Sequence, residues 1–288
     1  MILWCDGAHD PAENMRRDAA LLAAARAPDA APVLRLFQFA PHGITLSYAQ
    51  HPERQLDLGR CRRDGVPWAV RPTGGRAIFH AEEWTYALAA RIDDPDWGGS
   101  LAVAYDAVSR LLVRSLNRLG VPARHAPATV VRSAAAHTAS ASQAAPEAGL
   151  RGSPASATTT GAGPRHAAAP CFASTARHEV MLEGRKLVGS AQRRNADALL
   201  QQGSLLLGNG HLRLTDYLAI DEGARGGARA ALAARATGAD AFLGPHPPLE
   251  RWAAILEREL PGVRRLEGAA GLFLLTAPES GSYTGGLR

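Results

Sequence analysis

The sequence lacks any long apolar run, and this absence already limits what the protein can be. No stretch approaches the roughly 18 uninterrupted apolar residues that a membrane-spanning helix needs. The first residues also lack the basic start, apolar middle and small-residue cleavage site of an export signal. We therefore expect a cytoplasmic protein with no membrane partner.

Cysteine and lysine are both scarce. The three cysteines, Cys5, Cys61 and Cys171, are an odd and widely spaced set, which indicates reduced thiols and no disulfide framework. Of the 32 basic residues, 31 are arginine and one is Lys186. A chain this rich in arginine would use arginine wherever a plain surface cation suffices, so the single lysine is a candidate functional residue. The alternative for Lys186 is an ordinary solvated turn cation.

Several common functional motifs are missing. The chain has no P-loop, nucleophile elbow, Cys-x-x-Cys pair or His-Glu-x-x-His helix, and its ten histidines show no metal-ligand spacing. We therefore expect no metal. The net charge of +5 comes from arginines that are mixed with acidic residues along the whole chain. This distribution argues against nucleic-acid binding and favours an acidic protein partner.

The apolar pattern predicts a mixed α+β chain. Helical spacing indicates helices at 11–27, 101–116 and 248–260. Alternating or short apolar runs predict strands at 33–39, 44–48, 68–71, 77–80, 178–182, 187–191 and 205–207. We expect the first two of these strands to form one hairpin, and the strands on either side of residues 183–185 to form another.

Residues 133–169 differ in composition from the rest of the chain. Of these 37 residues, 30 are Ala, Ser, Thr, Gly or Pro, and Leu150 is the one large apolar residue. Such a segment cannot bury enough surface to offset the entropy lost on ordering it. We therefore predict a disordered insert within a single domain that spans 1–288. A second flexible segment is predicted at 221–247, before the last helix.

Two glycine-containing segments are candidate binding elements. In the first, paired glycines between predicted strands permit close backbone approach to a ligand, although a plain tight turn is the alternative. In the second, small residues occupy a strand that normally prefers bulky ones, which leaves room for an acyl chain or another backbone. The candidate residues are Arg71, Thr73, Gly74, Gly75, Arg76, Ala77 and His80 in the first segment and Gly189, Ser190 and Ala191 in the second.

Cys171 lies shortly before the predicted strand that Lys186 opens. An unperturbed thiol with a pKa near 8.5 is only about 3% thiolate at pH 7, so a nucleophilic cysteine needs a cationic neighbour. Lys186 is a candidate, because lowering the pKa by ~1.5 units takes ~2 kcal/mol, which one ammonium in a partly dry site can supply. Cys61 also has cationic neighbours, Arg60 and Arg62, but it lies away from both glycine segments, and we expect Cys61 and Cys5 to be structural.

The combined motifs resemble the biotin/lipoate protein ligase superfamily, in particular its octanoyltransferase branch with a cysteine nucleophile. The resemblance covers most of residues 11–218. It is carried by Pro11 to Met15, Ile44 to Gln50, Arg71 to Ala77 with His80, Thr85-Tyr86, Cys171-Phe172, Glu183 to Gln192 and Gln202 to Ser204. The resemblance implies an α+β fold related to class II synthetases, with a mixed, largely antiparallel sheet flanked by helices around an acyl-binding groove.

The resemblance also implies an acyltransferase of lipoate biosynthesis. Octanoyl would pass from acyl carrier protein to Cys171, and then to the lysine of a lipoyl-type domain such as the H protein of glycine cleavage or a 2-oxo acid dehydrogenase subunit. Lys186 would lower the cysteine pKa and hold the carbonyl oxygen, while the two glycine segments line the octanoyl slot. No cofactor is needed, because the donor is already a thioester. A basic surface would attract the acidic carrier and acceptor.

Departures from the family pattern leave two alternatives. Lipoate ligases typically have a third glycine where this chain has Arg76, and often an additional C-terminal domain, and both differences favour transfer. The insert and the pair Arg16-Arg17 also depart from the pattern. The first alternative is a lipoate or octanoate ligase that uses ATP and Mg, with Lys186 on the acyl-adenylate and Cys171 incidental. The second is a non-catalytic relative that binds lipoyl domains.

Overall fold

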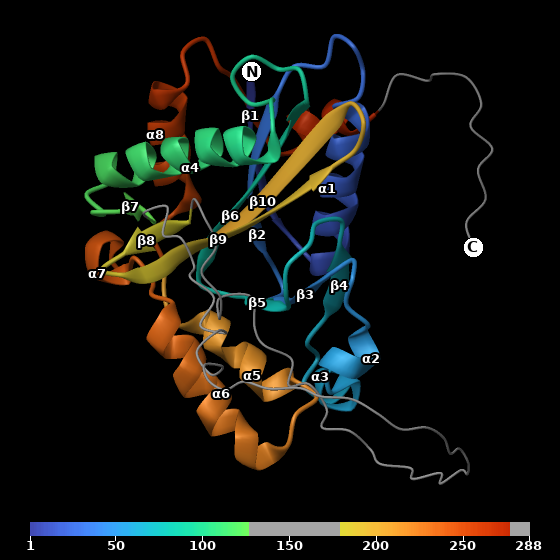
Figure 1. The fold of residues 1–288 in the computed structure, drawn as a ribbon, viewed down its shortest axis with the longest axis vertical. Helices are drawn as coiled ribbons and strands as arrows, with labels where there is room; N and C mark the ends of the chain where they lie inside the picture. Colours follow the sequence, from blue (N-terminus) through green and yellow to red (C-terminus); the bar gives the residue numbers. More distant parts are fainter. Residues whose placement is uncertain (127–178, 277–288) are drawn as a thin grey trace, which may run out of the picture.

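The computed structural model describes residues 1–126 and 179–276, which form two β-sheets with helices around them (Figure 1). The larger sheet has eight strands in the order β11-β1-β2-β6-β10-β9-β8-β7. Strand β1 pairs in parallel with β2 and β11, and the other neighbours pair antiparallel. The strands are β1 (Ile2–His9), β2 (Val33–Phe39), β6 (Glu83–Arg91), β7 (Arg124–His125), β8 (Val180–Leu182), β9 (Arg185–Arg194), β10 (Ala198–Leu206) and β11 (Arg264–Glu267).

The smaller sheet has three strands and packs beside the first helix. Its central strand, β3 (Gly43–Ser47), pairs in parallel with β4 (Trp68–Arg71) and antiparallel with β5 (Ile78–His80). Strand β4 contacts helix α1 (Pro11–Ala24), which covers one face of the larger sheet. The smaller sheet and this face of the larger sheet together enclose the pocket described below.

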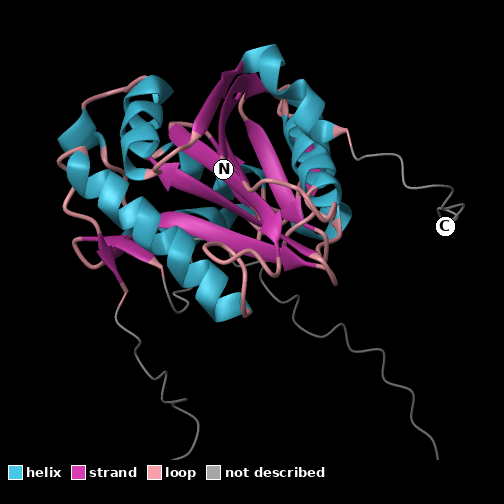
Figure 2. Cartoon of the chain, turned by 90° about the horizontal axis from the view of Figure 1, so that it is seen from above, coloured by secondary structure: helices cyan, strands magenta, loops and turns pink. Residues whose placement is uncertain are grey.

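Helices lie on both sides of the larger sheet (Figure 2). Helix α1 packs on one face, whereas α4 and α8 pack on the other. The helices are α1, α2 (Pro52–Gln55), α3 (Leu58–Arg63), α4 (Leu101–Arg118), α5 (Leu214–Tyr217), α6 (Glu222–Arg235), α7 (Asp240–Leu243) and α8 (Leu249–Glu259), with 3-10 turns η2 (Gly210–Arg213) and η3 (Gly268–Leu275). Among the residues that the structure describes, no helix has both the length and the apolar character needed to cross a membrane.

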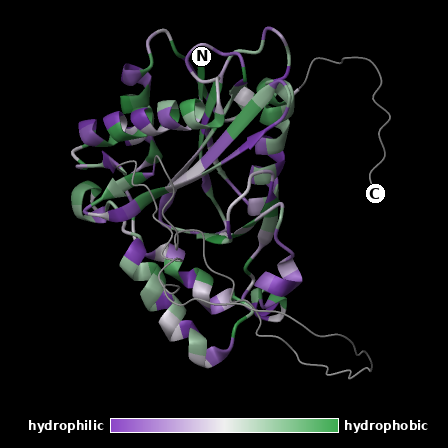
Figure 3. Cartoon of the chain, viewed as in Figure 1, coloured by the Kyte–Doolittle hydropathy of each residue, from purple (hydrophilic) through white to green (hydrophobic). Residues whose placement is uncertain are grey.

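The main hydrophobic core lies between the larger sheet and helices α4 and α8. On α4, buried residues such as Ala104, Val108 and Leu112 recur at helical spacing, so one side of the helix faces the core. Figure 3 shows hydrophobic and hydrophilic residues alternating along this helix. Trp84 of β6 stacks on Trp252 of α8 with ring centroids 5.6 Å apart. This core covers the face of the larger sheet that is opposite the pocket.

The hairpin predicted from 33–39 and 44–48 is wrong, although both strands exist. Strand β2 has its two edges paired with β1 and β6, whereas β3 belongs to the smaller sheet. Almost every residue of both strands is buried, so the sequence pattern could not show which sheet each joins. The second predicted hairpin is confirmed: β8 and β9 pair across a turn in which Glu183 and Gly184 have φ of 50° and 77°.

Residues 221–247, predicted as a flexible segment, instead contain α6 and α7. The glycines in this region suggested flexibility, but alanine and arginine favour a helix. Leu232 also anchors α6, because it is buried in an apolar cluster with Ile78 and Leu206. The insert predicted at 133–169 lies outside the described residues, and the single domain over 1–288 stays a prediction.

Candidate functional site

Strand β9 presents small residues to the space between the two sheets. Its Gly189 and Ala191 pair with Ser204 and Gln202 of β10, respectively. All four residues line a pocket that residues of the smaller sheet close from the opposite side. The face of β9 that carries Gly189 and Ala191 is therefore its pocket face.

A β-bulge places Lys186 on the pocket face. In the pairing of β9 with β8, Val188 lies opposite Val180, but Lys186 lies opposite the next residue, Met181. The extra residue, Leu187, is buried in the same core cluster as Val188, so strict alternation fails at this point. Lys186 consequently faces away from that core, toward the side that holds the pocket.

Lys186 is buried and ion-paired. Only 5% of its surface is exposed, and its Nζ donates a hydrogen bond of 2.5 Å to Glu179 Oε1, which is also buried. The other carboxylate oxygen, Glu179 Oε2, has no hydrogen-bond partner among the described residues. Burying this charge pair costs desolvation energy that a surface turn would avoid. The alternative of a solvated turn cation is therefore wrong.

Arg71 fixes the shape of the first glycine segment. Its guanidinium donates to the carbonyl oxygens of Gly74 at 2.8 Å and Arg76 at 2.7 Å, and on the other side to that of Thr45 at 3.2 Å. Gly75 has a φ of 96°, a conformation that favours glycine. The turn thus wraps around a buried cation at the pocket wall.

His80 belongs to a buried polar set beside the pocket. Its Nδ1 lies 2.6 Å from Glu83 Oε1, and its Nε2 lies 2.7 Å from Thr45 Oγ1. The same Glu83 oxygen accepts hydrogen bonds from Thr85 at 2.8 Å and Ser204 at 2.9 Å. These polar side chains form hydrogen bonds with one another. They therefore do not need hydrogen bonds from a ligand, and an apolar chain can lie against this wall.

The pocket is small, with a volume of about 40 Å³. By this measure it has room for about three water molecules. The predicted residues that line it are Arg71, Thr73, His80, Gly189, Ser190 and Ala191. In the described part of the chain, no group of three or more His, Cys, Asp or Glu residues is arranged to hold a metal ion.

The remaining predicted residues lie elsewhere. Gly74 is half-buried, while Gly75 and Arg76 are exposed on the turn. Ala77 is buried in a neighbouring apolar cluster. None of these four lines the pocket, so they shape the turn without contacting the space inside. Cys171 lies outside the described residues, and its approach to Lys186 stays a prediction.

Sequence reasoning missed nine pocket residues, among them Met15, Phe37, Phe39 and Gln202. A signal existed for some of them. Phe37 and Phe39 are two apart in a strand and therefore share one face. Gln202 is one of two adjacent glutamines in a strand between apolar residues, and a buried polar side chain implies a specific partner. Assigning Met15 required knowing which face of the sheet α1 covers.

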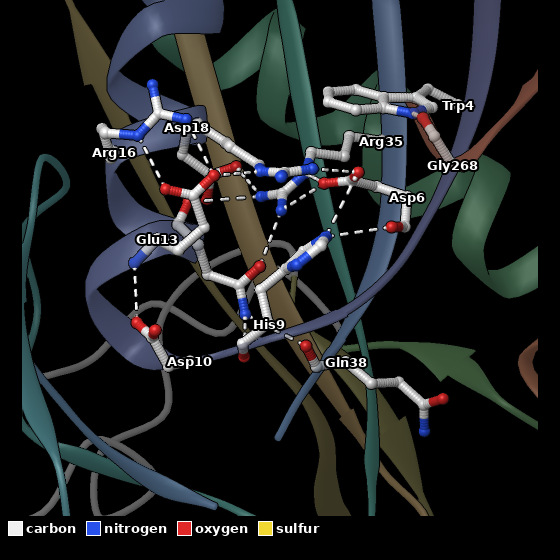
Figure 4. A network of polar contacts seen from close by, with 12 residues as sticks. Trp4, Asp6, His9, Asp10, Glu13, Arg16, Asp18, Arg35, Gln38 and Gly268 are labelled. Carbon is white, nitrogen blue, oxygen red and sulfur yellow. Dashed lines mark hydrogen bonds and ion pairs between the residues drawn. The ribbon is translucent and has the colours of Figure 1, made fainter. Parts of the chain in front are cut away.

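A buried charge cluster fixes α1 to the sheet (Figure 4). Arg35 of β2 is fully buried and donates to Asp6 at 2.7 Å, to Asp18 at 2.6 Å and to the side chain of Asn14 at 2.6 Å. Burial raises the pKa of Asp18, and the positive charge of Arg35 opposes that rise. Asp18 also accepts a hydrogen bond from Gln202, so the cluster extends to the pocket wall.

The chain is similar in sequence to known proteins of one family. Residues 10–260 match the model of the lipoyl protein ligase A/B catalytic domain. The octanoyltransferase LipM of Moorella thermoacetica is 32% identical over 201 residues, which cover 70% of this chain and 63% of that protein. The octanoyltransferase LipM of Kyrpidia tusciae is 33% identical over 202 residues, covering 70% and 64%. The chain thus spans less than two thirds of the length of these relatives.

Solved structures share the fold. A chain from an archaeal lipoylation system, a bipartite lipoate protein ligase with its E2 lipoyl domain from Thermoplasma acidophilum, aligns with a TM-score of 0.66 and 17% identity, covering 95% of this chain and 89% of that one. Lipoate-protein ligase A bound with ATP aligns with a TM-score of 0.59 and 18% identity, covering 95% and 92%. At these identities the likeness concerns the fold, and it confirms the predicted mixed sheet flanked by helices.

Proposed function

Because the chain belongs to the lipoyl protein ligase A/B catalytic domain family, we propose that it transfers octanoyl from acyl carrier protein, through Cys171, to a lysine of a lipoyl-type domain. The observation that carries this proposal is the buried Lys186 on the pocket face of β9. The relatives named octanoyltransferase LipM support the same activity. The donor is a thioester, so the reaction requires neither ATP nor another cofactor.

The strand places Lys186 beyond one end of the pocket. A strand rises about 3.3 Å per residue, and the bulge makes Lys186 and Val188 neighbours along the ladder, so Lys186 lies two steps, or about 7 Å, from Gly189 along β9. The acyl chain would lie over Gly189 and Ala191, with its carbonyl toward Lys186. Lys186 then contributes a positive charge where the carbonyl oxygen becomes negative in the transition state.

In the first half-reaction, the Cys171 thiolate attacks the thioester carbonyl of the octanoyl carrier. A bond forms between this sulfur and the carbonyl carbon, and the bond from that carbon to the carrier's sulfur breaks. The carrier leaves as a thiolate and takes up the proton that the Cys171 thiol released. The ammonium of Lys186 favours the thiolate form of Cys171, which lowers the pKa of this thiol.

In the second half-reaction, the neutral ε-amine of the acceptor lysine attacks the octanoyl thioester of Cys171. The new carbon–nitrogen bond replaces the carbon–sulfur bond, and the proton lost by nitrogen returns to the Cys171 sulfur. Glu179 acts as a positioning residue, because its 2.5 Å hydrogen bond holds the Lys186 ammonium in place through both steps.

Intact-mass measurement after incubation with octanoyl carrier protein tests the covalent step. We expect the wild type to gain one octanoyl group and Cys171→Ala to gain none. Cys61→Ser is the matched control: Cys61 is buried in an apolar cluster away from the pocket, so this variant should still be acylated. We expect Lys186→Met to slow acylation by about 100-fold, the loss typical of removing one group that stabilises the oxyanion.

The ligase alternative makes an opposite prediction in the same assay. A ligase would modify the lipoyl domain from free octanoate or lipoate only when Mg-ATP is present, and Cys171→Ala would leave that activity intact. Modification that depends on Mg-ATP and not on Cys171 would overturn the proposed transfer. Modification from octanoyl carrier protein without ATP would support it.

A further inference from the structure

We infer that Met15 forms the end wall of the acyl pocket and sets the length of the acyl chain that is transferred. This inference rests on the proposed octanoyl transfer and goes beyond it by naming what selects the substrate. Met15 lies on the side of α1 that faces the sheet, has 6% of its surface exposed and lines the pocket.

The strand register shows which end of the pocket is reactive. Gly189 pairs with Ser204, and Ala191 pairs with Gln202, so these pairs form two successive levels along the pocket. Lys186 lies beyond the Gly189 level, on the side away from Ala191. An acyl group with its carbonyl near Lys186 therefore points its methyl end toward the level of Ala191 and Gln202.

Met15 closes the pocket at this second level. Its Sδ lies 3.7 Å from Gln202 Nε2. The next residue on the same face of β10, Leu200, is fully buried in one apolar cluster with Met15 and with Ala69 of β4. Apolar residues therefore follow the second level along this face of β10. A longer acyl chain must therefore displace the Met15 side chain.

The other groups at this end are held by polar contacts. Gln202 accepts a hydrogen bond from Thr73 Oγ1 at 2.6 Å and donates one to Asp18. Arg193, the next residue after Ala191 on this face of β9, lies over the ring of Tyr48 at 4.6 Å from its centroid. These contacts tie α1, the glycine turn and both sheets together around the closed end.

Met15, whose thioether sulfur accepts only a weak hydrogen bond from Gln202 Nε2, is the adaptable part of the wall. Methionine is unbranched and can change shape at low cost, whereas Gln202 cannot move without losing its buried hydrogen bonds. Because the pocket is only about 40 Å³ in volume, a change of a few methylene groups in this side chain alters it substantially. Substitution of Met15 should therefore change chain-length preference more than it changes the chemistry at Lys186.

A competition assay with the full chain tests this inference. Equal amounts of hexanoyl, octanoyl and decanoyl carrier protein are offered together, and the masses of the modified lipoyl domain give the product ratios. We expect Met15→Ala to raise the ratio of decanoyl to octanoyl product by about 10-fold or more, and Met15→Phe to raise the ratio of hexanoyl to octanoyl product by a similar factor. Leu21→Ala is the control, because Leu21 is buried on the same helix but does not line the pocket.

The outcomes are distinguishable. Opposite shifts for the two Met15 variants, with the wild-type ratios kept by Leu21→Ala, support the inference, since general loosening of the fold cannot shift preference in both directions. Unchanged ratios in both folded Met15 variants, or an equal shift in Leu21→Ala, overturn the inference while the proposed function stands. If the wild type modifies the lipoyl domain with no acyl group from any carrier, the proposed function itself fails.

Discussion

Arg35 of β2 holds the buried side of α1 against the larger sheet through hydrogen bonds to Asn14 and Asp18. It carries a positive charge with no exposed surface, and it forms ion pairs with Asp6 and Asp18, whose side chains are also buried. The cluster holds α1 in place and, through Gln202, one wall of the pocket. A buried group of this kind is weak evidence of high stability, but breaking it is costly, because a charge is then left without its partner.

We expect Arg35→Met to lower the free energy of unfolding by about 3–5 kcal/mol, since the buried Asp18 loses its ion pair with Arg35, whereas Asp6 keeps an ion pair with Arg17. The deficit should shrink as the pH falls, because removing Arg35 raises the pKa of Asp18 further and the carboxyl then takes up a proton. Urea unfolding at pH 7 and pH 5 measures both effects. Arg16→Ala, which removes an exposed ion pair with Glu13, should cost less than about 1 kcal/mol. An equal cost for the two variants would contradict the prediction.

The cysteines show how burial separates structural from reactive thiols. Burial raises the pKa of Cys5 to about 12, and burial also raises the pKa of Cys61. Neither residue lines the pocket. Both therefore remain protonated at neutral pH, which agrees with the structural role expected for them and leaves Cys171 as the candidate nucleophile.

At the scale of single elements, β10 shows why a strand beside the pocket needs a glycine. A Cβ on Gly203 would lie 2.4 Å from Tyr86 Cε1 and 2.8 Å from Ser190 Oγ. The Tyr86 hydroxyl in turn lies 2.8 Å from the same Ser190 oxygen. Gly203 therefore lets the Tyr86 ring lie directly on the strand, opposite the pocket face.

We expect Gly203→Ala to lower the free energy of unfolding by about 1–3 kcal/mol, because the added methyl group overpacks a rigid site. Gly227→Ala on α6 is the matched control and should have the opposite sign. Nothing lies within 4 Å of a Cβ at Gly227, and alanine in a helix interior is favoured over glycine by about 0.5–1 kcal/mol. Urea unfolding of both variants provides the measurement. A neutral or stabilising Gly203→Ala would refute the packing argument.

Sequence patterns predicted elements well where one side of the element is exposed. Helix α4 was predicted from its spacing, and the turn between β8 and β9 from its polar and glycine residues. The pattern did not show which strands pair where both faces of a strand are buried, as in β2 and β3. In such strands nearly every residue is buried whichever neighbour the strand has. Strands β1 and β6 were not predicted, and β6 is buried along nearly its whole length, so no alternation of polarity marks it in the sequence.

The candidate site divides in the same way. Glycine pairs and a unique lysine are visible in the sequence, so the turn at Arg71 and the strand at Lys186 were both identified. The bulge at Leu187, which turns Lys186 to the pocket face, depends on how β8 and β9 pair. Met15 belongs to the site because α1 covers this face of the sheet, and Gln202 because it pairs with Ala191 of β9. Such long-range geometry is decided by packing, which local patterns do not record.

At the scale of the whole molecule, the pocket is an interface between two sheets, so its shape depends on how firmly they are joined. One connection runs from the Thr73 hydroxyl to Gln202, at 2.6 Å. A second connection is formed by η2, which follows β10 in the chain and packs against β5 of the smaller sheet. His211 of η2 is 1% exposed at this junction. The junction is therefore sensitive to any charge that develops on this imidazole.

Burial lowers the pKa of His211 from 6.5 to about 4, although the nearby carboxylates of Glu82 and Glu83 act in the opposite direction. Between pH 6.5 and about pH 4, His211 is therefore protonated in the unfolded chain and mostly neutral in the folded chain. Stability contributed by the neutral imidazole is complete above about pH 6.5 and is lost progressively as the pH falls toward 4. At pH 5.5 the loss amounts to about 1 kcal/mol.

We expect His211→Gln to remove this part of the pH dependence. Carboxylates also titrate in the range, so the measurement is the difference between wild type and variant in urea unfolding at pH 7.0 and pH 5.5. The wild type should lose about 1 kcal/mol more than His211→Gln between the two values. His51→Gln is the control, because the side chain of His51 is 66% exposed and should leave the wild-type dependence unchanged. If His211→Gln retains the full wild-type loss, the imidazole does not titrate differently in the folded and unfolded chains, and the acid sensitivity of the junction must come from its carboxylates.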